Sequence, residues 1–183
     1  MEIKGVAVKT LPKYIELKYP YIFDNWLSRL DEGVRDNFVT GIYSSRWYDV
    51  DRFVRRPILI AAEMIYLEPK NLAWDMGEFS AQYALNGIYR FFLRFGGPEN
   101  MIKRVPFFLQ NYYKPANVKI DYIDADNKKA ELFFYNFVKS DDVIIYRIAG
   151  WGYYTLLTSG AKTAKIKIKA LEVLNSKMFI EWS

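Results

Sequence analysis

The spacing of apolar residues changes once along this chain, at Lys114-Pro115, and this change restricts the possible folds. Before it, apolar side chains recur every three or four residues, as on one face of an α-helix. After it, apolar residues from Val118 to Tyr122 alternate with charged ones, which is typical of a half-buried strand. We therefore expect an α+β fold, with a helical part over about 1–115 and a sheet-containing part over about 116–183.

The helical part is divided by proline, glycine and capping residues. Its strongest signal is the stripe of Leu72, Met76, Phe79 and Tyr83, which advances by four, three and four residues along one helix face. Thr10 is expected to cap the first helix. The other expected elements are a strand over Ile3–Val8 and helices over Leu11–Lys18, Tyr21–Leu30, Asp31–Val39 closed by Gly41, Asp49–Leu67 interrupted at Pro57, Ile88–Phe95, and Glu99–Tyr113 bent at Pro106.

The remaining residues predict two hairpins around one helix, and thus an antiparallel sheet packed by helices in a single domain over 1–183. The alternative for the helix is a strand at its start, because the run VIIYRI is apolar and β-branched. The expected elements are strands Val118–Tyr122 and Lys129–Phe137, a helix from Asp141-Asp142 to Ser159 closed by Gly160, a Lys/Ile strand, a turn at Asn175-Ser176, and a final MFIEW strand.

The sequence contains no Cys and no His. It therefore excludes disulfides, zinc sites built on Cys or His, His-ligated haem, and nucleophilic triads that use His. No acidic residues show metal-ligand spacing, so we expect no metal and no cofactor. The chemistry left for catalysis is carboxylates, Lys, Tyr, Ser and Thr, and we expect no enzyme activity.

The net charge of +5 comes wholly from residues 101–183. Lys165, Lys167 and Lys169 alternate with isoleucines, and we interpret them as the solvent face of a strand whose lysines discourage edge pairing. The alternative is a basic strip for nucleic acid, but no stacking-aromatic or glycine-rich motif accompanies it. The apolar run Pro57–Leu67 is too short to span a membrane and includes Glu63. Without a signal-peptide pattern, a cytoplasmic location is the default expectation.

Charged residues in two places raise the question of catalysis or anion binding. Glu63 and Glu78 lie on apolar helices, where burial would raise the pKa of a carboxyl group. Exposure to solvent or pairing with arginine is the favoured interpretation for both, and catalysis is the alternative. In SSRWYDVDRFVRR, a salt-bridge network with Asp49 and Asp51 is favoured over a phosphate site. Its arginines are Arg46, Arg52, Arg55 and Arg56.

Aromatic residues make up 18% of the chain and concentrate in three of the expected helices. They can form an ordinary core or line a cavity for an apolar ligand. Arg147 is a single cation in the apolar run from Val143 to Gly152. We expect it to pair with a carboxylate or to face a pocket.

Several stretches resemble known families. IAGWGYYTLL, the Lys/Ile strand and the terminal MFIEW are similar to the end of 4-vinyl reductase domains. With KGVAVKTLPKYIELKYP, the order of elements resembles the superfamily that joins those domains to haem nitric-oxide sensors and Bet3-type subunits of Golgi transport complexes. SSRWYD, WDMGEFSAQYALNGIYRFFL and YRIAGW look like a bacterial family of unknown function on that fold.

The chain departs from each relative at its functional residues. It lacks the proximal His that haem sensors carry on the helix before the first hairpin, here Pro98–Tyr113, and Tyr146-Arg147-Ile148 does not match their Tyr-x-Ser-x-Arg propionate clamp. The cysteines of 4-vinyl reductase domains and the acylated Cys of Bet3-type subunits are also missing. What the resemblance implies is the fold and an internal apolar pocket, without haem.

Together these observations favour a non-enzymatic domain that binds a small hydrophobic or aromatic ligand in a sensory or regulatory role. The alternative is an interaction module with a solid core, working as a homodimer or with a protein partner through aromatics such as Trp47 and Tyr48. The residues expected to contact a ligand are Trp74, Phe79, Tyr83, Phe92, Arg147 and Trp151.

Trp151 is the strongest candidate for a pocket wall. It stands between Gly150 and Gly152, and each glycine costs a helix roughly 1 kcal/mol relative to alanine. Such glycines are tolerated where a backbone must approach a neighbour closely, or where a β-carbon would keep the indole from a cavity. We expect Trp151 to be buried against the helix that carries Leu72 and Tyr83.

Overall fold

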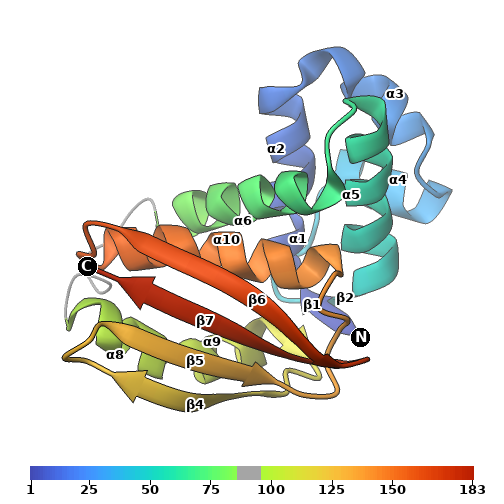
Figure 1. Ribbon diagram of the computed structural model, residues 1–183. Helices are drawn as coiled ribbons and strands as arrows, with labels where there is room; N and C mark the ends of the chain where they lie inside the picture. The colour runs from blue at the N-terminus through green and yellow to red at the C-terminus, as the bar shows by residue number, and fades with distance from the viewer. Residues whose placement is uncertain (86–95) are drawn as a thin grey trace.

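The computed structural model describes residues 1–85 and 96–183 and has the predicted α+β architecture. Figure 1 shows the N-terminal helices gathered at one end and a four-stranded sheet from the C-terminal half at the other. Two long helices, α6 (Pro69–Leu85) and α10 (Val143–Thr158), lie between them. The expected helix Ile88–Phe95 lies outside the described residues.

The N-terminal segment forms one short strand and a series of short helices. Asp31 accepts a hydrogen bond of 3.0 Å from the backbone of Val34, and Gly41 ends the same helix with a positive φ of 114°, as predicted. The elements are β1 (Glu2–Lys4), α1 (Gly5–Val8), α2 (Thr10–Lys18), a 3-10 turn (Pro20–Ile22), α3 (Phe23–Ser28) and α4 (Glu32–Thr40).

Two expectations about this segment are wrong. The strand predicted over Ile3–Val8 ends at Lys4, and the chain turns into α1 because the Gly5 N–H donates to the Arg46 carbonyl instead of continuing a strand. Thr10 is not a helix cap. It lies inside α2, and its hydroxyl donates a hydrogen bond of 2.9 Å to the Ala7 carbonyl.

A small sheet joins three distant parts of the chain. Strand β2 (Trp47–Asp49) and strand β3 (Tyr113–Lys114) both pair antiparallel with β1, in the order β2-β1-β3. The sequence does not predict β2, because three residues between turns carry no alternation to detect. This sheet places Tyr113 beside the N-terminal segment.

The helix expected over Asp49–Leu67 is shorter and begins differently. A π-helical turn covers Asp51–Arg55, and α5 follows at Arg56–Met64. Pro57 lies in the first turn of α5, where its missing N–H costs no helical hydrogen bond, so the helix restarts there. Trp26 of α3 is fully buried, and its indole N–H donates to the Pro57 carbonyl at 2.9 Å.

Glycine allows α6 and α10 to touch backbone to backbone. A β-carbon on Gly150 would overlap the carbonyl oxygen of Trp74 in α6, and one on Gly77 would overlap the carbonyl oxygen of Arg147 in α10. Figure 1 shows the two helices side by side above the sheet. The close approach expected at Gly150 is therefore confirmed, whereas Gly152 has only ordinary contacts.

The helices before the first hairpin are α8 (Gly97–Lys103) and α9 (Val105–Tyr112). The bend predicted at Pro106 is present, because the single expected helix divides at Arg104. Both helices have a proline in the first turn, where no backbone donor is needed.

The main sheet is antiparallel, with the order β4-β5-β7-β6, as the two predicted hairpins require. Helices α9 and α10 pack against this sheet. The turn predicted at Asn175-Ser176 is wrong, because both residues belong to β7 and the chain reverses at residues 173–174. The strands are β4 (Val118–Asp124), β5 (Lys129–Phe134), β6 (Ala164–Glu172) and β7 (Asn175–Trp182).

The edge strand β6 has the predicted alternation. Its lysines at 165, 167 and 169 are exposed, whereas Ile166 and Ile168 are partly buried against the core. Lysines along an unpaired edge oppose pairing with another chain.

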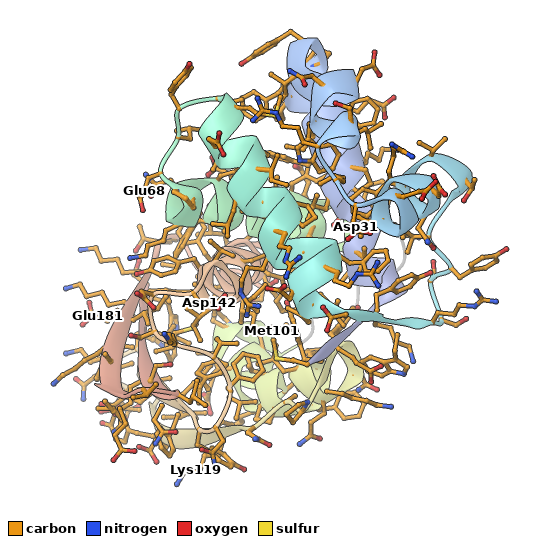
Figure 2. The ribbon with its side chains drawn as sticks, turned by 90° about the vertical axis from the view of Figure 1, so that its right-hand side faces the viewer. Asp31, Glu68, Met101, Lys119, Asp142 and Glu181 are labelled. Atoms are coloured by element: carbon orange, nitrogen blue, oxygen red, sulfur yellow. The ribbon has the colours of Figure 1, made fainter. Side chains whose placement is uncertain are left out.

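One carboxylate joins the two halves of the molecule. Asp142 caps α10 by accepting a hydrogen bond of 2.9 Å from the Ile144 N–H, and its other oxygen accepts one of 2.8 Å from Arg55. Figure 2 shows Asp142 near the start of α10, facing the N-terminal helices. The helix start predicted at Asp141-Asp142 is confirmed.

Within the described residues, no helix combines the length and apolarity that crossing a membrane requires.

The glycine contact gives a paired prediction. Gly150→Ala should destabilise the protein by roughly 1–3 kcal/mol, because the added carbon forces α6 and α10 apart. Gly152→Ala should stabilise it by up to about 1 kcal/mol, because its β-carbon would lie 3.6 Å from Ile166 and alanine favours the helix. Urea unfolding of both variants tests this, and equal effects would contradict the backbone contact.

Candidate functional site

An apolar cavity lies where α1, α6, α9 and α10 meet. The space between its lining atoms, open solvent included, is about 550 Å³. Most of the wall is apolar, and the lining side chains that carry polar atoms are those of Ser80, Tyr112, Tyr113, Arg147 and Trp151. The lining residues are Val6, Ala7, Gly77, Ser80, Ala84, Phe108, Leu109, Tyr112, Tyr113, Arg147, Ile148 and Trp151.

Arg147 is the most unusual side chain of this wall, because only 3% of it is exposed. Its guanidinium donates a hydrogen bond of 2.7 Å to the Ala7 carbonyl and one of 3.3 Å to the Thr10 hydroxyl. The Thr10 oxygen lies 3.2 Å from that of Ser80, so a polar corner links α1, α2, α6 and α10. The Nε–H of Arg147 is buried and has no hydrogen-bond partner in the described part of the chain.

The carboxylate expected beside Arg147 is absent. Across residues 1–85 and 96–183, no acidic group lies within ion-pair distance of Arg147, and residues 86–95 contain no Asp or Glu. Its nearest acidic neighbour along the chain, Asp142, pairs with Arg55 at 2.8 Å. Of the two expectations for Arg147, the structure agrees with the one that places it at a pocket.

Tyr113 stands near Arg147 in the same wall. Burial raises the pKa of its phenol, and the Arg147 charge opposes that shift only in part. The phenol is therefore neutral at physiological pH and does not neutralise the guanidinium.

A second cavity adjoins the first on the sheet side of α10. The two share the side chains of Phe108, Leu109, Ile148 and Trp151. The rings of Phe108 and Trp151 are 6.0 Å apart, so an aromatic pair forms the boundary between the cavities. The second cavity is otherwise lined by Met101, Ile102, Val105, Leu132, Gly152, Thr155, Leu156, Ile166, Met178 and Ile180.

Two of the six residues expected to contact a ligand, Arg147 and Trp151, line the first cavity. Trp74, Phe79 and Tyr83 line neither of the two cavities. The Trp74 indole donates to Glu78 at 2.5 Å, and Phe79 packs against Tyr14 and Tyr83. Phe92 lies outside the described residues. A role in ligand binding for these side chains stays a prediction.

Trp151 lies against α6 as expected, but it is half-buried where full burial was predicted. Its backbone nitrogen lies beside Gly77, and its side chain packs in a small cluster with Ala81, Met101 and Phe108.

Sequence reasoning missed Ser80, a buried serine one turn after Met76 in an otherwise apolar face. That polar interruption of the stripe is the signal that would have identified it. Phe108 and Leu109 were expected on the inner face of their helix, and the structure adds that this face borders a cavity.

The two candidate catalytic carboxylates lie outside both cavities. The Glu63 side chain is 76% exposed and 3.4 Å from Arg29, so the burial considered for it is wrong. Burial does raise the pKa of Glu78, although the Trp74 hydrogen bond acts in the opposite direction. Because Glu78 lines neither of the two cavities, we attribute this raised pKa to burial within the packing of α6.

The salt-bridge network expected after Ser45 is present in part: Asp51 takes part, but Asp49 instead accepts a hydrogen bond from the Arg52 backbone, and Arg46 lies over the ring of Tyr43. Arg55 binds Asp51 and Asp142, and Arg56 binds Asp51 at 2.7 Å. Arg52 extends the network to Asp31 at 2.9 Å. The network leaves these three arginines paired, and this favours the interpretation as salt bridges over that as a phosphate site.

The aromatic contact patch expected at Trp47 and Tyr48 is wrong. Tyr48 is only 8% exposed, because alternation along β2 turns it inward, where its hydroxyl accepts a hydrogen bond from the Tyr43 N–H. Trp47 is half-buried under the ammonium groups of Lys4 and Lys114, 4.3 and 4.2 Å from its ring.

The fold is similar to that of H-NOX proteins. The Fe(II) unliganded H-NOX protein from K. algicida matches with a TM-score of 0.78 at 11% identity, over 99% of this chain and 97% of that chain. An H-NOX protein from S. oneidensis in the Fe(II)NO ligation state matches with a TM-score of 0.73 at 11% sequence identity, over 99% of both chains. A mutant of the T. tengcongensis H-NOX matches with a TM-score of 0.69 at 14% sequence identity, over 99% of this chain and 98% of that chain. Identities this low establish the fold alone.

No family model matches the sequence, and no curated protein matches it. The likeness to 4-vinyl reductase domains and Bet3-type subunits therefore stays a resemblance of the sequence.

The side chains present do not fit a haem iron. Proteins hold it mainly through His, Cys or Tyr, with Met as a second ligand beside His, and this chain has neither His nor Cys. The cavity brings phenols from Tyr112 and Tyr113, but burial holds Tyr113 in the neutral form, which binds iron poorly. In the described ranges, no group of three or more acidic residues is arranged to hold a metal ion.

Glu78 allows a test of the raised pKa. A buried acid with a raised folded-state pKa destabilises the protein as pH rises from the ordinary value of 4.5 through that pKa. Glu78→Gln keeps an oxygen for the Trp74 N–H and removes the charge. It should therefore be more stable than wild type near pH 7, with the difference vanishing at acid pH. Urea unfolding from pH 3 to 8 measures this, with Glu63→Gln as the surface control.

The two tryptophans Trp26 and Trp151 should respond differently to truncation. Trp26→Ala should cost roughly 3–5 kcal/mol, because it empties a fully packed site. Trp151→Ala should cost clearly less, because its side chain is half-buried and already borders cavities. Thermal and urea unfolding of both variants would show the order, and an equal loss would identify Trp151 as ordinary core.

Proposed function

We propose that this protein is a non-enzymatic sensory or regulatory domain that binds a small hydrophobic or aromatic molecule, without haem, in the cavity between α1, α6, α9 and α10. The observation that carries the proposal is that apolar cavity, bounded by Trp151 and Phe108, at the centre of an H-NOX-like fold. H-NOX structures described as unliganded or in the Fe(II)NO ligation state indicate that this fold can enclose a small-molecule site.

Three features support binding over catalysis. The wall of the cavity is largely apolar, and neither Glu63 nor Glu78 reaches it. The phenol of Tyr113 is held neutral by burial, so it supplies no base near neutral pH. Finally, the Phe108–Trp151 pair joins α9 to α10 at the boundary between the two cavities, so a ligand beside this pair would contact both helices.

An interaction module with a solid core is the alternative from the sequence. Its aromatic patch at Trp47 and Tyr48 is not exposed as that alternative needs. The two cavities also argue against a solid core. No specific contact surface on the described residues favours this function over ligand binding.

The cavity can be tested with 1-aminoanthracene, an uncharged dye that brightens in apolar surroundings. Wild-type protein should bind it at about one equivalent. Ala84→Phe fills the cavity wall and should weaken binding at least about tenfold, whereas Ala170→Phe, at an exposed position on β6, should not. Absence of binding, or equal binding by the two variants, would contradict the proposal.

The absence of haem has a separate test. Titration with haemin should give no stoichiometric Soret band, because the chain lacks imidazole and thiolate ligands. Native mass spectrometry of protein purified from its own host should show an organic ligand in place of haem. A one-to-one haem complex in either experiment would overturn this part of the proposal.

A further inference from the structure

Arg147 presents an electrostatic problem that the protein itself does not solve. Burial of a cation costs free energy unless an opposite charge or a full set of acceptors compensates it. Here Arg147 is 3% exposed, and its hydrogen-bond partners, the Ala7 carbonyl, the Thr10 hydroxyl and the phenol of Tyr113, are all neutral. Its Nε–H is buried without a partner in the described residues.

No charge in the chain provides the compensation. Asp142 is committed to Arg55, and burial keeps Tyr113 from ionising. The segment 86–95 contributes no acid, since its sequence contains none. An arginine in this state is prepared for an anion from outside the chain, and the planar fork of guanidinium matches a carboxylate.

The rest of the wall determines what such an anion must carry. Beyond the polar corner, the first cavity is apolar up to the Phe108–Trp151 pair, and the second cavity, lined by residues such as Met101 and Ile166, lies on the other side of that pair. One cation at one end and apolar surface at the other select a molecule with a single charge and an apolar body.

We propose that the cavity binds an amphipathic monocarboxylate, with the carboxylate on Arg147 and the apolar body directed toward the Phe108–Trp151 pair. This proposal rests on the proposed function, since it identifies the class of ligand for the same cavity. Thr10 and Ser80 hold the polar corner, and Arg147 is the group that selects the charge. A straight-chain acid and an aromatic acid share this chemistry.

The experiment uses calorimetry with matched pairs of acid and amide at pH 7.5: decanoate with decanamide, and 2-naphthoate with 2-naphthamide. Each pair differs in charge but hardly in shape. A charge-assisted hydrogen bond is worth about tenfold to a hundredfold in affinity, so wild-type protein should prefer the acid by at least about tenfold. The pair that binds more tightly tells whether a straight-chain or an aromatic body fits.

Variants assign the preference to Arg147. Arg147→Gln should abolish the preference for the acid while amide binding changes by less than about threefold, and Arg147→Lys should retain part of it. Arg104→Gln removes the same charge from an exposed position and should behave as wild type. If Arg147→Gln does not fold, the ratio of acid to amide affinity in wild-type protein still decides whether the cavity selects a carboxylate.

The outcomes separate the two proposals. Equal binding of acid and amide by wild-type protein would overturn the role of Arg147 and leave the apolar pocket standing. A preference for the acid over the amide that survives in Arg147→Gln would also overturn the role of Arg147. If no probe binds, 1-aminoanthracene included, then the pocket and the carboxylate site are both refuted.

Discussion

The backbone contact between α6 and α10 is the constraint on which the rest of this structure depends. Gly77 and Gly150 let each helix place a carbonyl where any other residue would carry a side chain. Contact this close sets the rotation of α10 about its axis. That rotation directs Arg147 toward α1 and Trp151 toward Phe108, and so decides which side chains meet in the cavity. Packing at crystal-like density transmits such a constraint through neighbouring side chains.

The polar corner shows how the fold tolerates a buried charge. The carbonyl of Ala7 is near the end of the short helix α1, where backbone oxygens lack intrahelical donors, and Arg147 supplies one. Arg147 also bonds to the hydroxyl of Thr10, which in turn donates to the same carbonyl. These contacts satisfy part of the guanidinium, whereas its Nε–H has no partner in the described residues. Under the proposed function, this one side chain would combine structural support with ligand selection.

The comparison with H-NOX proteins separates fold from chemistry. This chain shares the arrangement of elements over nearly its whole length at 11–14% identity, yet contains no histidine. A fold of this kind supplies a cavity between its helices and its sheet, and the side chains in that cavity decide what it holds. Here an arginine and two tyrosines stand in a wall that is otherwise largely apolar, and the chain offers neither His nor Cys to an iron centre.

Local pattern was sufficient for much of the architecture. The stripe through Leu72 and Met76, the Asp142 cap and the alternation along β6 correctly predict α6, α10 and the edge strand, because each depends on residues within a few positions of one another. The sequence alone also excluded histidine and cysteine chemistry. Tertiary structure decided the remainder: the pairing of β1 with β2 and β3, the burial of Tyr48, the salt bridge between Asp142 and Arg55, and the lack of a carboxylate beside Arg147. These features depend on segments that lie far apart in the chain, and periodicity carries no information about which distant segments meet.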